Sequence, residues 1–232
     1  MNIAAIIPVH GRHPLLKLTI QRLLNKNRIR HVICVGEEDN LRVCEDAGAM
    51  FIQHQNKPIG MKINIGFARA KELKVDAAAF VGSSDWLSDS WFDITAPYLK
   101  DNAIVGKEVF NLAHITDSIY VAEWQGYGKD TGRKGELIGI GRVYSGEFLD
   151  RINWEPVAYH LNNSLDYSTI MKLVKLRPPM SVLDYDSDII QSLSISCDKW
   201  SNMHSFDREL YNSILNLDPT DWLRKYFREP FS

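Results

Sequence analysis

Short apolar segments alternate with amphipathic ones along the first hundred residues, and this alternation limits the folds open to the chain. The apolar segments, each typical of a buried strand, are Ile3 to Val9, His31 to Val35, Ala49 to Gln53 and Ala77 to Val81. The segments between them place apolar residues at helical spacing. Strands separated by helices form βαβ units, whose right-handed crossovers put helices on both faces of a sheet. The sequence therefore predicts an α/β fold with a mostly parallel sheet flanked by helices.

Several helices have recognisable caps and buried faces. Asp39 or Asn40 can cap one helix, Ser88 another, and Ser145 a short helix that runs through Ile152. The spacing of Met61, Ile65, Ala68 and Leu73 outlines a helix after the turn at Pro58 and Gly60. The helix that Ser88 can cap is expected to bury Trp91, Phe92, Thr95 and Leu99, and a helix over 164–175 has Tyr167, Ile170, Met171 and Val174 on its apolar face.

The second half of the chain is less regular. Residues 103–110, 119–124 and 182–196 are strand-like, the last interrupted by Asp184, Asp186 and Asp188, which favour a solvated sheet edge. Residues 125–135 form a polar glycine-rich loop, for which a hairpin tip in solvent is favoured over a lid covering a substrate.

Composition limits the class of protein. The chain has 232 residues, 45% of them hydrophobic, and a formal net charge of -2, which suits one globular domain over residues 1–232. The balanced charge argues against a nucleic-acid coat or a polybasic membrane binder. Three separated cysteines, and the lack of a signal-like or membrane-spanning apolar run, favour a soluble, cytoplasmic protein.

Polar residues follow the predicted strands, where open α/β sheets bind their ligands. The strand ends are Val9-His10-Gly11-Arg12, Gly36-Glu37-Glu38-Asp39 and Gly82-Ser83-Ser84-Asp85. The last tetrad carries a carboxylate that can hold a hard divalent cation. Asp85 can equally cap the helix that follows.

These strand ends resemble motifs of a known family. Ile6 to Arg12, Val35 to Asp39, Asn56 to Gly60 with Asn64 to Ala70, and Ala79 to Ser88 follow one another as in the family 2 glycosyltransferases. The resemblance covers roughly residues 1–100 well and the remainder loosely. It implies the GT-A fold, with a nucleotide-sugar-binding half over 1–100 and an acceptor-binding half over 101–232.

The resemblance assigns most of the donor site to the first half. Pro8, Val9, His10 and Arg12 would line the nucleotide pocket, Glu37 or Asp39 would face the base or ribose, and Lys62 and Asn64 would approach the sugar or phosphates. Ser84 and Asp85 fall at the family's Asp-x-Asp motif, which would hold Mn²⁺ or Mg²⁺. Gly82 and Ser84 replace its two aspartates, so Asp85 is the one carboxylate left and a modest metal affinity is expected.

The resemblance assigns three further residues to the second half. Arg142, in a glycine-rich segment, would meet a phosphate, although a simple glycine-rich turn is the favoured interpretation of this segment. Asp166 begins a helix and would be the catalytic base; the same acid could merely complement the helix dipole. His204 lies where a histidine of many such enzymes reaches the metal or diphosphate.

The expected activity is transfer of a sugar from a nucleoside-diphosphate sugar to an acceptor hydroxyl, with inversion. The acceptor can be a glycan, a protein, a small molecule or a modified nucleic-acid base. A sugar nucleotidyltransferase of the same fold is one alternative. A non-catalytic member that binds a nucleotide or glycan is another, because the Asp-x-Asp aspartates are replaced.

Overall fold

The computed structural model describes residues 1–11, 13–87, 90–108, 110–115, 119–124, 126–127, 133, 135–176, 180–182 and 192–197. Arg12, His204 and the three alternating aspartates at 184, 186 and 188 lie outside this part of the chain. Most of the glycine-rich loop, residues 125, 128–132 and 134, lies outside it too.

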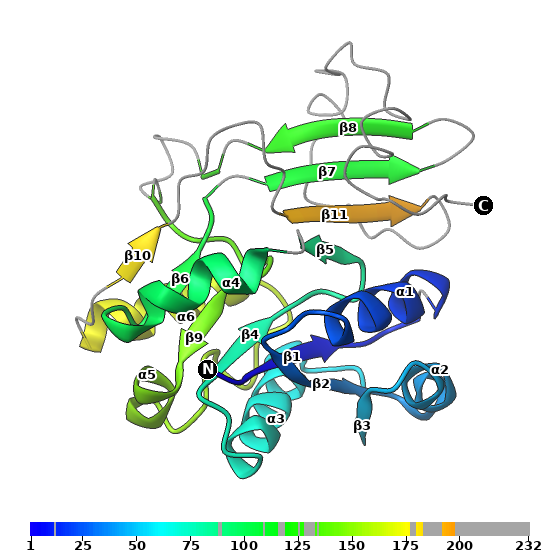
Figure 1. The fold of residues 1–232 in the computed structure, drawn as a ribbon, viewed down its shortest axis with the longest axis horizontal. Helices are drawn as coiled ribbons and strands as arrows, with labels where there is room; N and C mark the ends of the chain where they lie inside the picture. The colour runs from blue at the N-terminus through cyan, green and yellow to red at the C-terminus, as the bar shows by residue number, and fades with distance from the viewer. Residues whose placement is uncertain are drawn as a thin grey trace.

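The main sheet has seven strands in the order β10-β6-β9-β4-β1-β2-β3 (Figure 1). The strands are β1 (Ile3–Pro8), β2 (Ile29–Gly36), β3 (Met50–Gln53), β4 (Ala77–Phe80), β6 (Ile104–Gly106), β9 (Val143–Ser145) and β10 (Met180–Val182). Neighbours pair in parallel, except that β9 runs antiparallel to both β4 and β6. The predicted α/β fold with a mostly parallel sheet is confirmed.

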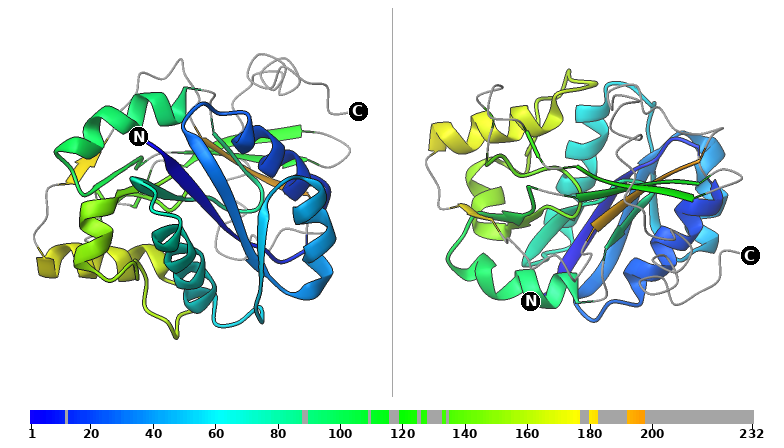
Figure 2. Two further views of the ribbon diagram at one scale, coloured as in Figure 1. Left: turned by 60° about the horizontal axis from the view of Figure 1, so that its bottom comes forward. Right: turned by 90° about the horizontal axis from the view of Figure 1, so that it is seen from above.

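Helices cover both faces of this sheet (Figure 2). They are α1 (His13–Leu24), α2 (Leu41–Asp46), α3 (Ile59–Glu72), α4 (Trp91–Thr95), α5 (Gly146–Arg151) and α6 (Leu165–Leu176), with 3₁₀ turns η1 (Glu38–Asn40) and η2 (Ala96–Lys100). Alternate residues of β1 divide the core between the faces. Ile3 and Ile7 belong to one cluster with Leu16 of α1 and Trp91 of α4. Ala4 and Ile6 belong to another, with residues of α3, α5 and α6.

The chain leaves the main sheet after β4 and enters a second sheet of four strands at β5. This sheet contains β5 (Asp85–Leu87), β7 (Phe110–Ile115), β8 (Ile119–Trp124) and β11 (Ser192–Cys197) in the order β5-β11-β7-β8. The chain passes from β4 into β5 through one tight turn, and β5 pairs antiparallel with β11. The expected strand over 182–196 is therefore two strands in two different sheets, because β10 ends at Val182 and β11 begins at Ser192.

The predicted apolar face of α6 is wrong in part. Ile170 packs against the core, but Tyr167, Met171 and Val174 lie in solvent, and Thr169 and Leu173 are buried instead. The helix predicted after residue 58 is confirmed as α3. Ile65 and Leu73 pack against the core beside the buried Ile63, Phe67 and Ala70, whereas Met61 is exposed. The buried stripes combine apolar residues with polar ones that are bonded inside the protein, and spacing of apolar residues alone does not identify such a face.

Other local expectations are confirmed. Trp91, Phe92, Thr95 and Leu99 are all buried. Ser145 caps α5, since its Oγ accepts a hydrogen bond of 3.3 Å from the amide of Phe148. Within the described residues, no helix combines the length and the apolar character needed to cross a bilayer.

Candidate active site

The carboxyl ends of β1 and β2 are joined by a buried asparagine. Asn40 accepts a hydrogen bond of 3.2 Å from the Gly11 amide and donates one of 3.2 Å to the Glu37 carbonyl oxygen. Its side chain therefore links the two loops and does not cap α2, which corrects the expected capping role. Pro8 ends β1, and the Val9 amide continues the pairing by donating to Val35 at 2.8 Å.

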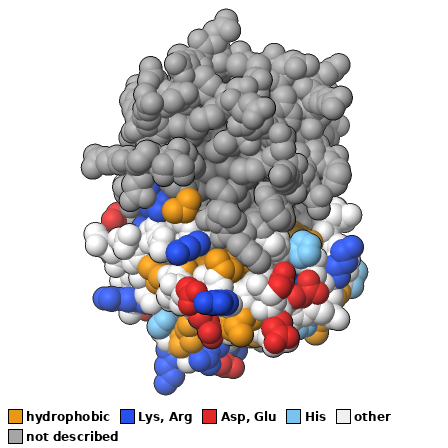
Figure 3. Space-filling model, turned by 90° about the vertical axis from the view of Figure 1, so that its right-hand side faces the viewer, with side chains coloured by type: hydrophobic (Ala, Val, Ile, Leu, Met, Phe, Trp, Pro, Cys, Tyr) orange, Lys and Arg blue, Asp and Glu red, His pale blue; other side chains and the backbone are white. Residues whose placement is uncertain are grey.

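Charged side chains surround these two loops. His10 Nδ1 lies 3.7 Å from a carboxylate oxygen of Glu37, and both side chains are exposed. Asp39 accepts a hydrogen bond from the Asn40 amide group. Acidic side chains and histidines lie together on the side of the molecule shown in Figure 3, the side toward which β1 and β2 run. The structure thus brings five of the predicted nucleotide-pocket residues to the carboxyl ends of β1 and β2: Pro8, Val9, His10, Glu37 and Asp39.

Lys62 of α3 is a buried cation behind this edge, with 1% of its surface exposed. Its Nζ donates to the Val9 carbonyl oxygen at 2.6 Å and to Asn56 Oδ1 at 3.0 Å. Burial lowers the pKa of Lys62 to about 8, although Glu37 and Asp39 partly oppose this effect. The loop that follows β1 is therefore held by a hydrogen bond from a lysine whose pKa is unusually low.

Asn64, two residues further along α3, is occupied elsewhere. Its Nδ2 donates to the Val157 carbonyl oxygen at 2.9 Å, and its Oδ1 accepts from the Val157 amide at 3.3 Å. Both ends of this amide are bonded within the protein, so the geometry gives no support to the predicted contact with the sugar or phosphates. Asn64 instead holds the segment before α6 against α3.

The turn between β4 and β5 folds the Asp85 carboxylate back onto the chain. Asp85 Oδ2 accepts a hydrogen bond of 2.6 Å from the Gly82 amide, and Asp85 and Ser84 are both buried. A Cβ atom on residue 82 would lie 2.8 Å from Asp85 Oδ2. Asp85 begins β5 and α4 begins only at Trp91, so the alternative that Asp85 caps this helix is wrong.

The donor set for a divalent cation is small here. No group of three or more His, Cys, Asp or Glu side chains that could hold a metal occurs among the described residues. At the turn, one carboxylate and the Ser84 hydroxyl are the oxygen donors that the sequence predicts. Such a set does not make a metal centre built by the protein alone, and suits only an ion that brings most of its ligands with it.

Arg142 and Asp166 form a largely buried ion pair. Arg142 Nη2 lies 2.7 Å from Asp166 Oδ1, and Nη1 donates to the Leu137 carbonyl oxygen at 3.3 Å. The Arg142 side chain is 2% exposed and that of Asp166 24%. Burial would lower the pKa of Arg142, but Tyr144 and Asp166 outweigh it and raise this pKa. The Arg142 guanidinium is therefore positively charged at any physiological pH.

The ion pair lies against the end of β4. Phe80, the last residue of β4, donates its amide to the Arg142 carbonyl oxygen at 2.9 Å. A Cβ on Gly139 would lie 3.0 Å from Asp166 Oδ1 and 3.1 Å from the Phe80 ring, so the glycine lets the carboxylate approach the strand end. Asp166 and Asp85 both lie near the carboxyl end of β4: Asp166 is close to Gly139 and Phe80, and Asp85 accepts from the Gly82 amide.

Tyr127 and Arg133, which the sequence did not single out, complete this region. The Tyr127 hydroxyl donates to Asp166 Oδ2 at 3.3 Å, and the Arg133 guanidinium lies 3.5 Å from the centre of the Tyr127 ring. Burial and then the charge of Asp166 raise the pKa of Tyr127. Tyr127 thus contacts Asp166, and Arg133 stacks on Tyr127. The tip of the expected hairpin, residues 128–132, lies outside the described residues. The one sequence signal of Tyr127 and Arg133 is an aromatic and a cation within a run of glycines.

The sheet order and solved structures together define the class: the chain has the GT-A fold, as its resemblance to family 2 glycosyltransferases predicts. A scan of protein-family models and a search of curated sequences each found no match to this chain.

Three solved structures illustrate the fold. The S. aureus TarS fragment 1–349 in complex with UDP-GlcNAc has a TM-score of 0.57 at 15% identity, over 89% of this chain and 62% of that one. The mannosyltransferase PcManGT from Pyrobaculum calidifontis, in complex with GDP-Man and Mn²⁺, has a TM-score of 0.54 at 8% identity, over 84% and 56%. A 4-diphosphocytidyl-2C-methyl-D-erythritol synthase from Anaerococcus prevotii has a TM-score of 0.51 at 14% identity, over 84% and 86%. The chain thus spans less than two thirds of the TarS fragment and of PcManGT.

Proposed function

We propose that the protein is a glycosyltransferase that uses a nucleoside-diphosphate sugar and that Asp166 is its catalytic base. The observation that carries this proposal is the Asp166 carboxylate, held 2.7 Å from Arg142 at the end of β4. Open α/β sheets bind ligands beyond the carboxyl ends of their strands, and this is where Asp166 lies. Two solved structures with this fold, TarS and PcManGT, were obtained with a nucleotide sugar bound.

The proposed reaction is a single displacement. The acceptor oxygen attacks the anomeric carbon while the bond from that carbon to the diphosphate breaks, and the nucleoside diphosphate leaves with the bonding electrons. The acceptor's hydroxyl proton passes to a carboxylate oxygen of Asp166. Because attack and departure occur on opposite sides of the carbon, the configuration inverts. Arg142 holds Asp166 Oδ1, so Oδ2 is the oxygen that would receive the proton.

The donor site is proposed at the ends of β1 and β2. His10, Glu37 and Asp39 lie there, and Lys62 supports the first loop from behind through the Val9 carbonyl oxygen. Arg12, which the same proposal places beside them, lies outside the described residues. Carboxylates suit the N–H groups of a nucleobase or the ribose hydroxyls. Ser84, at the β4–β5 turn, would approach the diphosphate.

A divalent cation is proposed to accompany the donor's diphosphate, with Asp85 as its protein ligand; the proposed second ligand, His204, lies outside the described residues. Such an ion, when bound, would neutralise charge on the leaving diphosphate. The solved structure of PcManGT is a complex with Mn²⁺, which supports testing Mn²⁺ first. A donor-dependent affinity is expected: Mn²⁺ should bind weakly alone and more tightly with a nucleoside diphosphate.

Asp166→Asn tests the base directly. The variant should lose sugar transfer, because the amide cannot accept the proton, while it still binds the nucleotide. A thermal-shift screen of nucleoside diphosphates and their sugars, with and without Mn²⁺, identifies the donor first, and calorimetry then compares donor affinity in the two proteins. Transfer at the wild-type rate by Asp166→Asn would remove Asp166 from this role.

A sugar nucleotidyltransferase is the second candidate. It is supported by the fold of the diphosphocytidyl-methylerythritol synthase, of which this chain covers 86% of the length. Release of pyrophosphate from a nucleoside triphosphate mixed with a sugar phosphate would favour it. A non-catalytic protein remains the third reading, because Gly82 and Ser84 stand at the motif's aspartates. Slow hydrolysis of a nucleotide sugar without acceptor would count against that reading.

A further inference from the structure

Both carboxylate oxygens of Asp166 accept a hydrogen bond from another part of the chain. Arg142 Nη2 binds Oδ1 at 2.7 Å, and the Tyr127 hydroxyl donates to Oδ2 at 3.3 Å. The oxygen that the proposed reaction leaves for the acceptor's proton is thus the one that Tyr127 contacts. An acceptor hydroxyl that donates to Oδ2 therefore competes with the Tyr127 hydroxyl.

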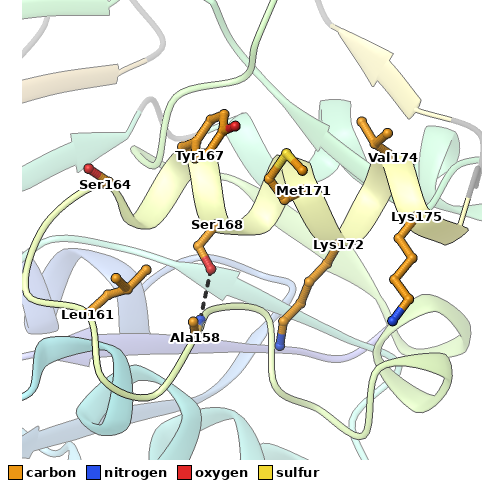
Figure 4. A pocket seen from close by; sticks show the side chains of 9 residues that line it. All are labelled: Ala158, Leu161, Ser164, Tyr167, Ser168, Met171, Lys172, Val174 and Lys175. Atoms are coloured by element: carbon orange, nitrogen blue, oxygen red, sulfur yellow. Dashed lines mark hydrogen bonds between the residues drawn. The ribbon is translucent and has the colours of Figure 1, made fainter.

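Asp166 lies on a helix that is fixed to its surroundings. Ser168 Oγ accepts a hydrogen bond of 2.9 Å from the Ala158 amide (Figure 4), and Thr169 Oγ1 donates to the Pro156 carbonyl oxygen at 3.1 Å. Both bonds tie the first turns of α6 to the segment that precedes this helix. When an acceptor arrives, we therefore expect the tyrosine hydroxyl to move and the carboxylate to stay.

Tyr127 is held beside Asp166 through its ring. The Arg133 guanidinium lies 3.5 Å from the centre of this ring and 5.6 Å from that of Tyr167 in α6, and Arg133 also pairs with Glu136 at 2.6 Å. The hydroxyl contact is weaker, because 3.3 Å is long for a hydrogen bond between two oxygens, commonly about 2.7 to 2.8 Å. The ring is thus fixed while the hydroxyl contact can be exchanged.

Water competes with an acceptor for Asp166, whose side chain is 24% exposed. A base that activates an acceptor hydroxyl activates water by the same chemistry. In that reaction the water oxygen bonds to the anomeric carbon, the diphosphate leaves with the bonding electrons, and a water proton passes to Oδ2. Burial, and then the charge of Asp166, raise the pKa of Tyr127, so its hydroxyl keeps its proton and remains a donor to Oδ2 at physiological pH.

We propose that Tyr127 is a positioning residue that favours transfer over hydrolysis, because its hydroxyl occupies Oδ2 of Asp166 until an acceptor replaces it. The inference rests on the proposed function, in which Asp166 is the base. A water molecule that displaces the tyrosine gains one contact, whereas an acceptor brings the binding energy of the rest of its molecule. The nucleotide sugar is therefore protected from water while the acceptor is absent.

Hydrolysis without acceptor tests this proposal, since no acceptor has to be known. Tyr127→Phe keeps the ring on which Arg133 stacks and removes the hydroxyl alone. It should hydrolyse the donor about tenfold faster than the wild type, the factor that one hydrogen bond to a carboxylate supplies. The assay measures nucleoside diphosphate released from the nucleoside-diphosphate sugars of the thermal-shift screen, with Mn²⁺. Tyr159→Phe is the matched control: it removes a hydroxyl that donates to Glu155 at 2.5 Å, and hydrolysis should stay at the wild-type rate.

Two further measurements separate a role through Asp166 from a loss of packing. Tyr127→Phe combined with Asp166→Asn should hydrolyse the donor no faster than Asp166→Asn alone, because the hydroxyl acts through the carboxylate. The ring signals of Tyr127 in nuclear magnetic resonance, assigned by their loss in Tyr127→Phe, need no activity. They should titrate at a lower pH in Asp166→Asn than in the wild type, because the charge of Asp166 contributes to the raised pKa of Tyr127.

Four outcomes would overturn the proposal and leave the proposed function in place. They are hydrolysis by Tyr127→Phe no faster than by the wild type, an equal increase in Tyr159→Phe, an increase that persists in the double variant, and an unchanged titration of Tyr127 in Asp166→Asn. If none of these proteins consumes a nucleotide sugar, alone or with candidate acceptors, the proposed function itself is removed, and the role of Tyr127 with it.

Discussion

Gly82→Ala should destabilise the protein by about 1 to 2 kcal/mol, although the residue has ordinary backbone angles. The new Cβ would lie 2.8 Å from Asp85 Oδ2 and 2.9 Å from its Cγ and Oδ1, so the carboxylate must turn away. It then loses the hydrogen bond from the Gly82 amide, and a bond to a charged acceptor contributes about 1.5 to 3 kcal/mol. The lower entropy of alanine in the unfolded chain offsets about 0.4 to 1 kcal/mol of this loss.

Urea unfolding, followed by tryptophan fluorescence, measures the effect. Gly106→Ala is the matched control, because its Cβ would meet its nearest atom at an ordinary 3.5 Å, and it should cost well under 1 kcal/mol. In the double variant, Gly82→Ala with Asp85→Ala, the losses in free energy of unfolding should be smaller than the sum for the two single variants, because the carboxylate that clashes with the new Cβ is absent. A Gly82→Ala protein as stable as the wild type, or strictly additive losses, would refute the account of Asp85 as folded back onto Gly82.

Two further predictions concern buried charges. Lys62→Met should change how the free energy of unfolding depends on pH. Folding lowers the pKa of Lys62 from 10.5 to about 8, so between these pH values the unfolded chain binds more protons than the folded one. The free energy of unfolding of the wild type therefore gains a contribution that rises with pH in this range, and the variant lacks it. Urea unfolding of both proteins across this range measures the difference, and parallel profiles would contradict it. Arg142→Met should cost about 3 kcal/mol, because Asp166 loses its buried partner, whereas Arg28→Met, which breaks the exposed pair with Asp93, should cost about 1 kcal/mol or less. Equal losses in the two variants would show that Asp166 is solvated well enough to need no partner.

The sequence predicted the parallel sheet, because each strand of the first hundred residues is a short apolar run between helices. It also named both Arg142 and Asp166, but not that they pair. That contact depends on β9 lying between β4 and β6, and pairing across a sheet is not encoded by local spacing.

Orientation was harder to predict than position. Asp85 was expected after β4 and is there, but its carboxylate direction follows from one hydrogen bond to Gly82. Tyr127 escaped notice because its partner Asp166 is 39 residues away and no periodic pattern links a loop to a helix start. Helix α6 has two faces that could pack against the core. The face with Thr169 is the buried one, because the Thr169 hydroxyl donates to the carbonyl oxygens of Pro156 and Leu165 inside the core.

Strand β9 has a consequence for engineering. It comes from the second half of the chain, yet it is inserted as the neighbour of β4, with β6 and β10 continuing the sheet beyond it. The two halves therefore share one continuous hydrogen-bonded framework, and a cut near residue 100 would strip β4 of its partner and expose its unpaired edge. A chimera that exchanges the second half of the chain with that of another protein would have to retain Val143–Ser145, and with it the register that sets Arg142 beside Phe80.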